Sequence, residues 1–233
     1  MSADQATLLK RLMALETGQL SDVLDEAGLP NHALSGELRP LGGTGLMVGV
    51  AVCARGEPIV RTQEPRARRL EVDALDKAIT AGAVLLIDTG GYHTGSCVGG
   101  LMAYSLQRAG CRGLVVDGAV RDAAEIRDLG LPVYCRGVTP VNGSRRWSVV
   151  EIGDPIGLPG AAGAHITVSP GDYVVGDADG AVVIPAAVAE SIVADAEELA
   201  RIEQGIADEM RAGGARGEVF NRNPRFGHVR RVT

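Results

Sequence analysis

Short apolar runs alternate with helical segments through the middle of the chain, and this alternation restricts the possible folds more than any other feature of the sequence. Continuous apolar runs, typical of strands buried on both faces, cover residues 83–88 and 113–117, and a further strand is expected over 132–136. Helices are predicted between them over 101–109 and 122–129, each closed by a glycine. Strands joined by helices indicate βαβ units, so the sequence predicts an α/β fold.

The segments on either side of this alternation are predicted to be helical at first and rich in strands later. Further helices are expected at residues 8–15, 20–27 and 71–81, and a strand at 46–54. Strands without intervening helices are expected after Pro140, at 147–152, 165–169, 173–175 and 181–184. A long helix over 186–210 precedes a segment with six arginines and one acid. We expect residues 1–210 to form a single domain and 211–233 an arginine-rich tail, either flexible or docked on a neighbouring subunit.

Charge and cysteine content exclude several classes of protein. Twenty-three basic and 29 acidic residues give a formal net charge of -6, opposite to that of a general binder of nucleic-acid phosphates. The four cysteines form no C-x-x-C pair, which argues against a structural zinc site and a disulfide framework. The sequence contains no apolar run of about 18 residues and no signal-peptide pattern. We therefore expect a soluble, cytoplasmic protein that binds neither nucleic acid nor membrane.

Arg121 and Asp122 follow one of the predicted buried strands and are the first candidates for chemistry. On one interpretation, Asp122 is the N-cap of the next helix and Glu125 is its capping-box partner. On the other, Arg121 lies beside a helix N-terminus, where an anionic ligand is favoured. A guanidinium binds carboxylate oxygens in pairs, and a carboxylate is a ligand for Mg²⁺. The pair could therefore hold a small carboxylate together with a cation.

A glycine-rich loop over residues 90–100 follows the strand that ends at Asp88. Its backbone N–H groups could form a nest for a substrate carboxylate; the alternative is a flexible turn between a strand and a helix. Ligands of α/β proteins gather at the carboxyl ends of the strands, where both Asp88 and Asp117 are predicted. We therefore expect the loop to face Arg121 across one pocket.

Four other motifs have alternative interpretations. Cys97 fits a G-x-C-x-G nucleophile elbow of a thiol hydrolase, but it lies several residues beyond the strand, and a small buried thiol is the alternative. His93 could be a general base or a polar surface residue. Residues 42–45 indicate a turn, because they precede their strand and lack the P-loop lysine. Residues 177–180 resemble a calcium loop but lack its spaced ligands, so we predict a hairpin turn.

The run 113–137 contains Val115-Val116-Asp117-Gly118-Ala119-Val120-Arg121-Asp122 and closely resembles the RraA-like / 4-hydroxy-4-methyl-2-oxoglutarate aldolase family. The likeness extends to residues 20–25, 87–91 and 170–185, and covers most of residues 17–200. It implies a swivelling β/β/α fold that assembles as a homotrimer or homohexamer, with active sites at subunit interfaces.

The resemblance also implies two activities. The aldolases of this family are class II enzymes, dependent on a divalent metal, which cleave 4-hydroxy-2-oxo acids to pyruvate and often decarboxylate oxaloacetate. The regulator branch binds and inhibits a ribonuclease without known catalysis. Some relatives have carried a demethylmenaquinone methyltransferase label, for which the residues offer no physical support.

By position in the family motif, Arg121 matches the arginine that holds the pyruvyl oxygens, and Asp122 matches the metal-binding aspartate. The carboxylate-binding loop corresponds to the backbone of Gly99, Gly100, Leu101 and Met102. Many aldolases of the family carry an acid where this chain has Gly100. We expect an Mg²⁺- or Mn²⁺-dependent lyase that acts on a small 2-oxo acid through a metal-stabilised enolate; the alternative is a non-catalytic regulator of a ribonuclease.

Overall fold

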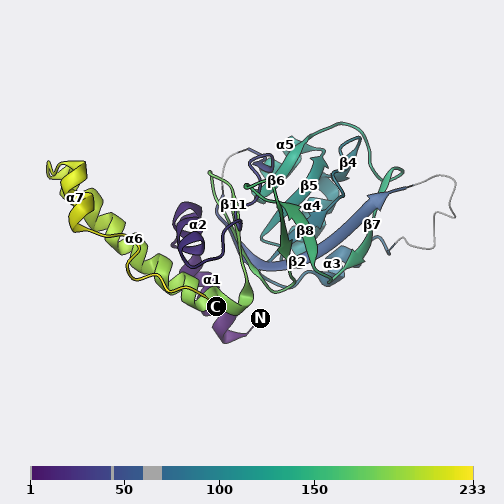
Figure 1. The fold of residues 1–233 in the computed structure, drawn as a ribbon. Helices are drawn as coiled ribbons and strands as arrows, with labels where there is room; N and C mark the ends of the chain where they lie inside the picture. The colour runs from purple at the N-terminus through teal and green to yellow at the C-terminus, as the bar shows by residue number, and fades with distance from the viewer. Residues whose placement is uncertain (1, 43–44, 60–69, 233) are drawn as a thin grey trace.

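The computed structural model describes residues 2–42, 45–59 and 70–232, and a curled sheet of nine strands forms the centre of this part (Figure 1). Its strands are β1 (Arg39–Pro40), β2 (Met47–Pro58), β3 (Ala83–Asp88), β4 (Ser96–Val98), β5 (Gly113–Val120), β6 (Val133–Val138), β7 (Trp147–Ile152), β10 (Tyr173–Gly176) and β11 (Ala181–Ile184). They are ordered β1-β6-β5-β3-β2-β10-β11, with β4 beside β5 and β7 beside β2. A separate hairpin consists of β8 (Ile156–Pro159) and β9 (His165–Val168).

The predicted βαβ units form the parallel part of the sheet. Strands β2, β3, β5 and β6 run parallel to their neighbours in this group, whereas β1, β7, β10 and β11 pair in the antiparallel sense. Every residue of β5 is buried, as expected for a strand covered on both faces. The α/β prediction is therefore confirmed, including a second half of the chain rich in strands.

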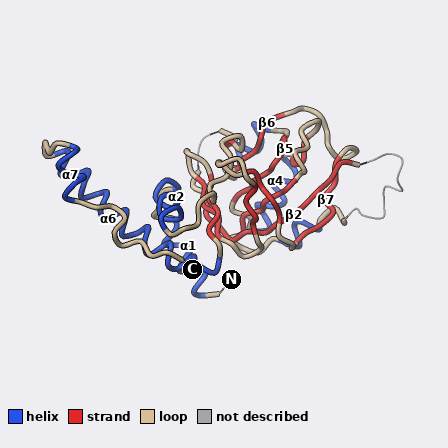
Figure 2. Tube along the Cα trace, viewed as in Figure 1, coloured by secondary structure: helices blue, strands red, loops and turns tan. Residues whose placement is uncertain are grey.

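Helices and the hairpin cover different regions of the sheet (Figure 2). The helices α3 (Ala74–Ala78), α4 (Gly100–Ala109) and α5 (Ala123–Asp128) pack with Leu85 and Val116 on one face. Strands β8 and β9 pack on the other face, which carries Leu86 and Val115. The helices α1 (Ala3–Leu12), α2 (Thr17–Glu26) and α6 (Ala189–Arg211) cover β10 and β11, and a short 3-10 helix, η1 (Ala186–Val188), leads into α6.

The arginine-rich segment packs against its own chain. Figure 1 shows α6 projecting from the sheet, α7 (Arg216–Arg222) near its far end, and the chain returning along α6. On the way back, Nε2 of His228 lies 2.9 Å from the carbonyl oxygen of Asp195, and the N–H of Val232 donates to Ala27 over 3.0 Å. These contacts place the described end of the segment against α6 and the end of α2 in the same chain. The division of the chain at residue 210 stays a prediction.

Several predicted boundaries were wrong. Strand β5 continues three residues past Asp117 because β4, which was not predicted, pairs with Ala119 and Val120. Helix α3 covers only Ala74–Ala78 instead of 71–81, and Asp73 provides no side-chain cap for a longer helix. Strand β8 and helix α7 were also missed, because both are short and their apolar residues show little periodicity.

The predicted hairpin turn at residues 177–180 is confirmed, since these residues join β10 to β11. Its first residue also anchors α2. The carboxylate of Asp177 accepts hydrogen bonds from the backbone N–H of Thr17 over 2.9 Å and from the Thr17 hydroxyl over 2.7 Å. Asp177 therefore caps the N-terminus of α2 from a distant part of the chain.

This cap predicts a stability that depends on pH. Burial alone would raise the pKa of Asp177, but hydrogen bonds from Thr17, Asp179 and Gly180 bring that pKa below its ordinary value. The stabilisation is therefore present above the unfolded pKa of about 3.9 and is lost as the pH falls through the lower folded pKa. We expect Asp177→Asn to lower the free energy of unfolding at pH 7 by about 1–2 kcal/mol, the size of a lost helix cap.

Urea denaturation at pH 7 and pH 3 measures this effect, and the difference between wild type and variant should shrink at pH 3. Asp179→Asn is the matched control, because the Asp179 side chain is exposed in the same turn. An equal difference at both pH values would mean that the charge of Asp177 does not stabilise α2.

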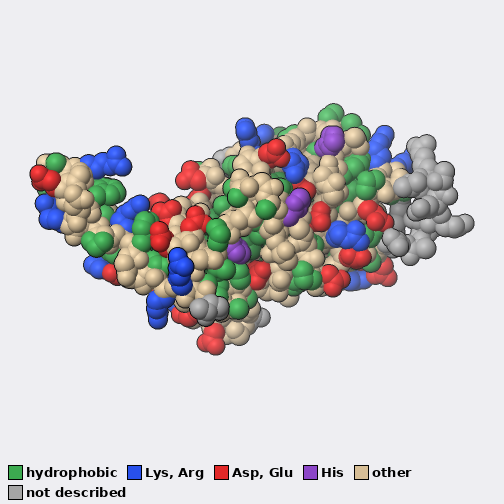
Figure 3. All heavy atoms as spheres, in the orientation of Figure 1, with side chains coloured by type: hydrophobic (Ala, Val, Ile, Leu, Met, Phe, Trp, Pro, Cys, Tyr) green, Lys and Arg blue, Asp and Glu red, His purple; other side chains and the backbone are tan. Residues whose placement is uncertain are grey.

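Figure 3 shows basic and acidic side chains interspersed over the visible face, without one continuous basic patch. Within the described ranges, no helix has the length and hydropathy needed to cross a membrane.

Candidate functional site

Two segments of the chain meet beyond the end of β5. One is the start of α4, directly after β4, and the other is the turn between β5 and α5. Strand β4 runs parallel to the end of β5, and the N–H of Arg121 donates to the carbonyl of Val98 over 3.0 Å. This pairing brings Gly99 and Gly100 next to Arg121 and Asp122.

Asp122 adopts a left-handed backbone conformation with a φ of 58°. It occupies the N-cap position of α5, yet its side chain makes no capping hydrogen bond to that helix. Instead, Oδ2 accepts a hydrogen bond of 3.1 Å from the N–H of Gly100, and it lies 3.3 Å from Nε of Arg121. The capping-box interpretation was therefore wrong. Aspartate tolerates this conformation better than most residues, and such strained positions cluster at functional sites.

Gly99 allows both charged side chains to lie against the backbone. A Cβ atom at this position would lie 2.9 Å from Nε of Arg121 and 3.0 Å from Oδ2 of Asp122. Gly99 is also the N-cap of α4 and offers no side-chain cap. The N–H groups of Leu101 and Met102, in the first turn of this helix, therefore have no partner within it and can bind an anion.

A second carboxylate, that of Glu125, fills the space beside Gly100. A Cβ atom at Gly100 would collide with the carboxylate of Glu125, which extends from the first turn of α5. Glu125 thus places a carboxylate beside the position at which the family resemblance implies an acid in many aldolases. We assigned Glu125 only to a helix cap from the sequence. Its spacing of three residues from Asp122, which places both on one side of a helical turn, was the available signal.

The site contains ligands of the kind that Mg²⁺ and Mn²⁺ prefer. Asp122 and Glu125 are hard oxygen donors, and Mg²⁺ usually binds one or two carboxylates together with water. The described residues include no group of three or more His, Cys, Asp or Glu side chains arranged to hold a metal. A metal ion held by these two carboxylates would therefore need water or substrate oxygens as its other ligands.

The charged pair is open to ligands. The side chain of Arg121 is 36% exposed and that of Asp122 is 38% exposed, and both contact the same first turn of α4. A small acid bound there could contact the guanidinium and the helix N-terminus together.

The two other aspartates considered from the sequence lie elsewhere. Asp117 is 4% exposed on the opposite face of β5, where Nε of Arg136 lies 2.5 Å from its Oδ1. Burial raises the pKa of Asp117 against the opposing effect of Arg136. Asp88 ends β3 and accepts a hydrogen bond from the N–H of Gly90. Asp117 is therefore a buried carboxylate paired with a partly exposed arginine, and Asp88 shapes the glycine-rich loop.

Neither Cys97 nor His93 contributes to the charged pair. Cys97 is 8% exposed, and burial raises the pKa of its thiol to about 12, so it is not a thiolate near neutral pH. The hydrolase interpretation of Cys97 is therefore unsupported. His93 is exposed, and its Nδ1 lies 3.0 Å from the carbonyl oxygen of Gly91. Of the predicted turn at 42–45, residues 43 and 44 lie outside the described residues.

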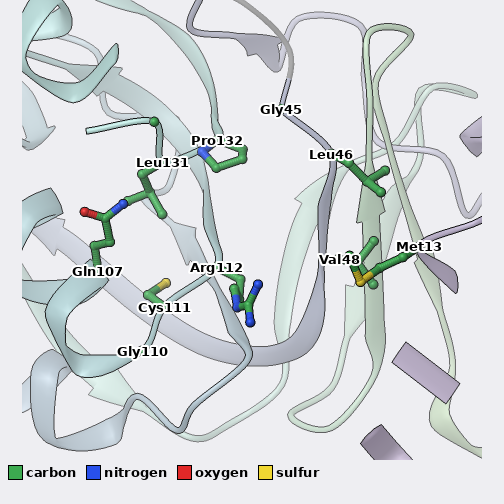
Figure 4. Close-up of a pocket in the computed structure, with 11 residues that line it drawn as sticks. Met13, Gly45, Leu46, Val48, Gln107, Gly110, Cys111, Arg112, Leu131 and Pro132 are labelled. Atoms are coloured by element: carbon green, nitrogen blue, oxygen red, sulfur yellow. The ribbon is translucent and has the colours of Figure 1, made fainter. Parts of the chain in front are cut away.

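A pocket of about 400 Å³ lies at the other end of β5 (Figure 4). Arg112 and Leu131 line it on one side, and Met13, Leu46 and Val48 line it on the other. Arg112 precedes β5 and Arg121 follows it, so the eight residues of the strand separate the two places by roughly 25 Å. This pocket is therefore distinct from the site around Asp122.

A family model and several known proteins match most of this chain. A family model described as RraA-like, Aldolase/RraA, matches residues 17–183. A Halalkalibacterium halodurans protein named "Putative 4-hydroxy-4-methyl-2-oxoglutarate aldolase" is 30% identical over 198 residues, which are 85% of this chain and 86% of that protein.

Two solved structures share the fold. That of Streptomyces coelicolor RraAS2, described as an unusual member of the RNase ES inhibitor RraA protein family, has a TM-score of 0.75 and 29% identity, and the match covers 88% of this chain and 98% of the other. The RNA-processing inhibitor RraA from Thermus thermophilis has a TM-score of 0.52 and 26% identity, with 73% and 92% covered. The stretch matched by the family model runs from the start of α2 into β11, and so includes both segments of the site.

Proposed function

Because this chain belongs to the RraA-like family, we propose that it is a divalent-metal-dependent lyase that cleaves a small 2-oxo acid. The swivelling β/β/α fold of that family, expected from the sequence, is the fold of this chain. The observation that carries the proposal is the convergence of Arg121, Asp122 and Glu125 on the N-terminus of α4, where Asp122 accepts only the N–H of Gly100.

The chain's own groups account for binding and for charge stabilisation. The N–H groups of Leu101 and Met102 would receive the substrate carboxylate, as helix N-termini do for anions. Arg121 would donate hydrogen bonds to the carboxylate and the 2-oxo oxygen. The C4 hydroxyl of a 4-hydroxy-2-oxo acid would lose its proton to solvent and leave as a carbonyl, or the C4 carboxylate of oxaloacetate would leave as CO₂. The electron pair of the broken C3–C4 bond becomes an enolate with negative charge on the 2-oxo oxygen, and C3 then takes a proton from solvent to give pyruvate. The guanidinium is already in place to stabilise this charge, which is the most effective form of electrostatic catalysis.

Asp122 and Glu125 would hold the Mg²⁺ or Mn²⁺ ion. When bound, the cation supplies Lewis acidity toward the substrate oxygens that Arg121 also contacts. Asp122 would be oriented for this role by the N–H of Gly100, and Glu125 would provide the acid that is absent at Gly100. Retro-aldol cleavage of a 4-hydroxy-2-oxo acid and decarboxylation of oxaloacetate both generate the enolate of pyruvate, so one site can serve both reactions.

We also propose that the chain acts as a homotrimer or homohexamer. Three large apolar side chains near the site are exposed in the single chain: Leu101 at 77%, Tyr104 at 47% and Val138 at 56%. Leu101 and Tyr104 lie on α4, and Val138 pairs with Val120 next to Arg121. Exposed apolar side chains beside a polar site are typical of a surface that another subunit covers.

The test of the function is pyruvate release from oxaloacetate and from 4-hydroxy-4-methyl-2-oxoglutarate, measured with a coupled assay. We expect activity with Mg²⁺ or Mn²⁺, its loss in excess EDTA, and its recovery when the metal is restored. Activity that survives EDTA would overturn the metal requirement. Inactivity with every metal, together with binding to an RNA-degrading endonuclease, would favour the regulator.

A further inference from the structure

Strand β5 changes its partner just before the candidate site. It pairs with β3 as far as Val116, opposite Ile87, and it pairs with β4 from Ala119, opposite Ser96. The connection from β3 to β4 must therefore pass over Asp117 and Gly118. Any shift of this connection would carry the start of α4 with it.

Thr89 ties the connection to β5 at this point. It is fully buried, and its hydroxyl donates a hydrogen bond to the carbonyl oxygen of Asp117. The hydroxyl oxygen of Thr89 in turn accepts a hydrogen bond of 3.0 Å from the N–H of Tyr92. A hydroxyl can donate and accept at the same time, so one side chain links β5 to the beginning of the glycine-rich loop.

The loop also lies directly against Gly118. A Cβ atom there would lie 2.8 Å from the carbonyl oxygen of Tyr92 and 3.1 Å from Sγ of Cys97. Both Tyr92 and Cys97 are more than nine-tenths buried, so the loop has little freedom to move away from β5. The Thr89 hydroxyl therefore adds directional hydrogen bonds between the loop and β5, which are otherwise held together by packing.

We propose that Thr89 is a positioning residue. It sets the register of the site, which is the position of the start of α4 relative to the turn between β5 and α5. Asp117, its partner, lies four residues before Arg121, and Tyr92 belongs to the loop that leads to Gly99. With this contact intact, the N–H of Gly100 faces the carboxylate of Asp122. In the described part of the chain, the hydroxyl of Thr89 hydrogen-bonds with Asp117 and Tyr92 and not with the charged pair. The effect on catalysis rests on the proposed function, whereas the effect on the register does not.

Thr89→Val removes the hydroxyl and keeps the branched shape, and Thr89→Ser keeps the hydroxyl. We expect Thr89→Val to lower kcat for pyruvate release and to weaken Mn²⁺ binding by about tenfold each, the effect of losing an outer contact that orients a ligand. Hydrogen exchange over residues 98–103 should become faster. Thr89→Ser should restore all three measurements to nearly their wild-type values.

Thr17→Val is the matched control. Thr17 is also a buried threonine with a hydrogen-bonded hydroxyl, but it lies at the start of α2 and contacts Asp177. This variant should lose stability without changing kcat, Mn²⁺ affinity or exchange over residues 98–103. If Thr89→Val does not fold, Thr89→Ala gives the same comparison without a new methyl group beside the Asp117 carbonyl.

The proposal is wrong if the valine and alanine variants keep both wild-type Mn²⁺ affinity and wild-type exchange, or if serine fails to rescue them. A wild-type protein that releases no pyruvate would contradict the lyase function alone. In that case hydrogen exchange of residues 98–103 still decides whether Thr89 sets the register.

Discussion

Replacing Arg121 with alanine is expected to lower kcat for pyruvate release by about a hundredfold or more, the effect of losing one oxyanion-stabilising donor. The guanidinium lies beside Asp122 and against Gly99, at the point where negative charge would develop on the substrate. A contact that strengthens as the bond breaks affects kcat more than substrate binding. Because the side chain is partly exposed and its ion pair is on the surface, the free energy of unfolding should change little.

Steady-state kinetics on oxaloacetate, together with circular dichroism, measure this prediction. Arg112→Ala is the matched control, because Arg112 lies at the other end of β5 and lines a different pocket. It should leave kcat unchanged. An Arg121→Ala variant that folds normally and keeps nearly full activity would remove the main support for the enzymatic mechanism.

The second large effect is expected from Asp122→Asn, which should abolish measurable Mn²⁺ binding and lower activity by about a hundredfold or more. Asparagine also tolerates the left-handed conformation, and its amide oxygen can accept the hydrogen bond from Gly100. The substitution therefore removes the negative charge while leaving the local backbone intact. Titration with Mn²⁺, followed by electron paramagnetic resonance, measures metal binding without reference to turnover.

The role of Glu125 in metal binding can be tested in the same titration. The carboxylate is removed at position 125 and introduced at position 100. Glu125→Ala should weaken Mn²⁺ binding less than Asp122→Asn does. Adding Gly100→Asp to that variant should recover much of the affinity, because the carboxylate then enters the same space from α4. Gly100→Asp alone should be harmful, since the two acids would compete for one place. Mn²⁺ binding that is unchanged in both Asp122→Asn and Glu125→Ala would show that the metal binds elsewhere.

The elements that carry the site were predictable because their signals are local. A continuous apolar run identifies β3 from its own residues, and a glycine marks the end of α4 just after Ala109. Arg121 and Asp122 were candidates because of their residue types after a buried strand, and their roles, implied by the family resemblance, stay a prediction. These inferences need only periodicity, burial and the properties of single side chains.

The arrangement within the site could not be predicted in this way. Asp122 had the spacing of a helix cap, yet its left-handed backbone directs the carboxylate to Gly100 of another segment. Asp117 had the position of a site residue, yet β5 continues past it and its side chain pairs with Arg136. In both cases the outcome depends on a partner more than ten residues away.

Local sequence thus specified the α/β class and most of the strands, because short-range periodicity suffices for both. Tertiary structure decided that Glu125 fills the space beside Gly100, that Asp177 caps α2 and that the arginine-rich segment returns along α6. Such contacts join residues that are distant in the chain. Their geometry depends on how strands and helices pack, and local sequence patterns do not predict that packing.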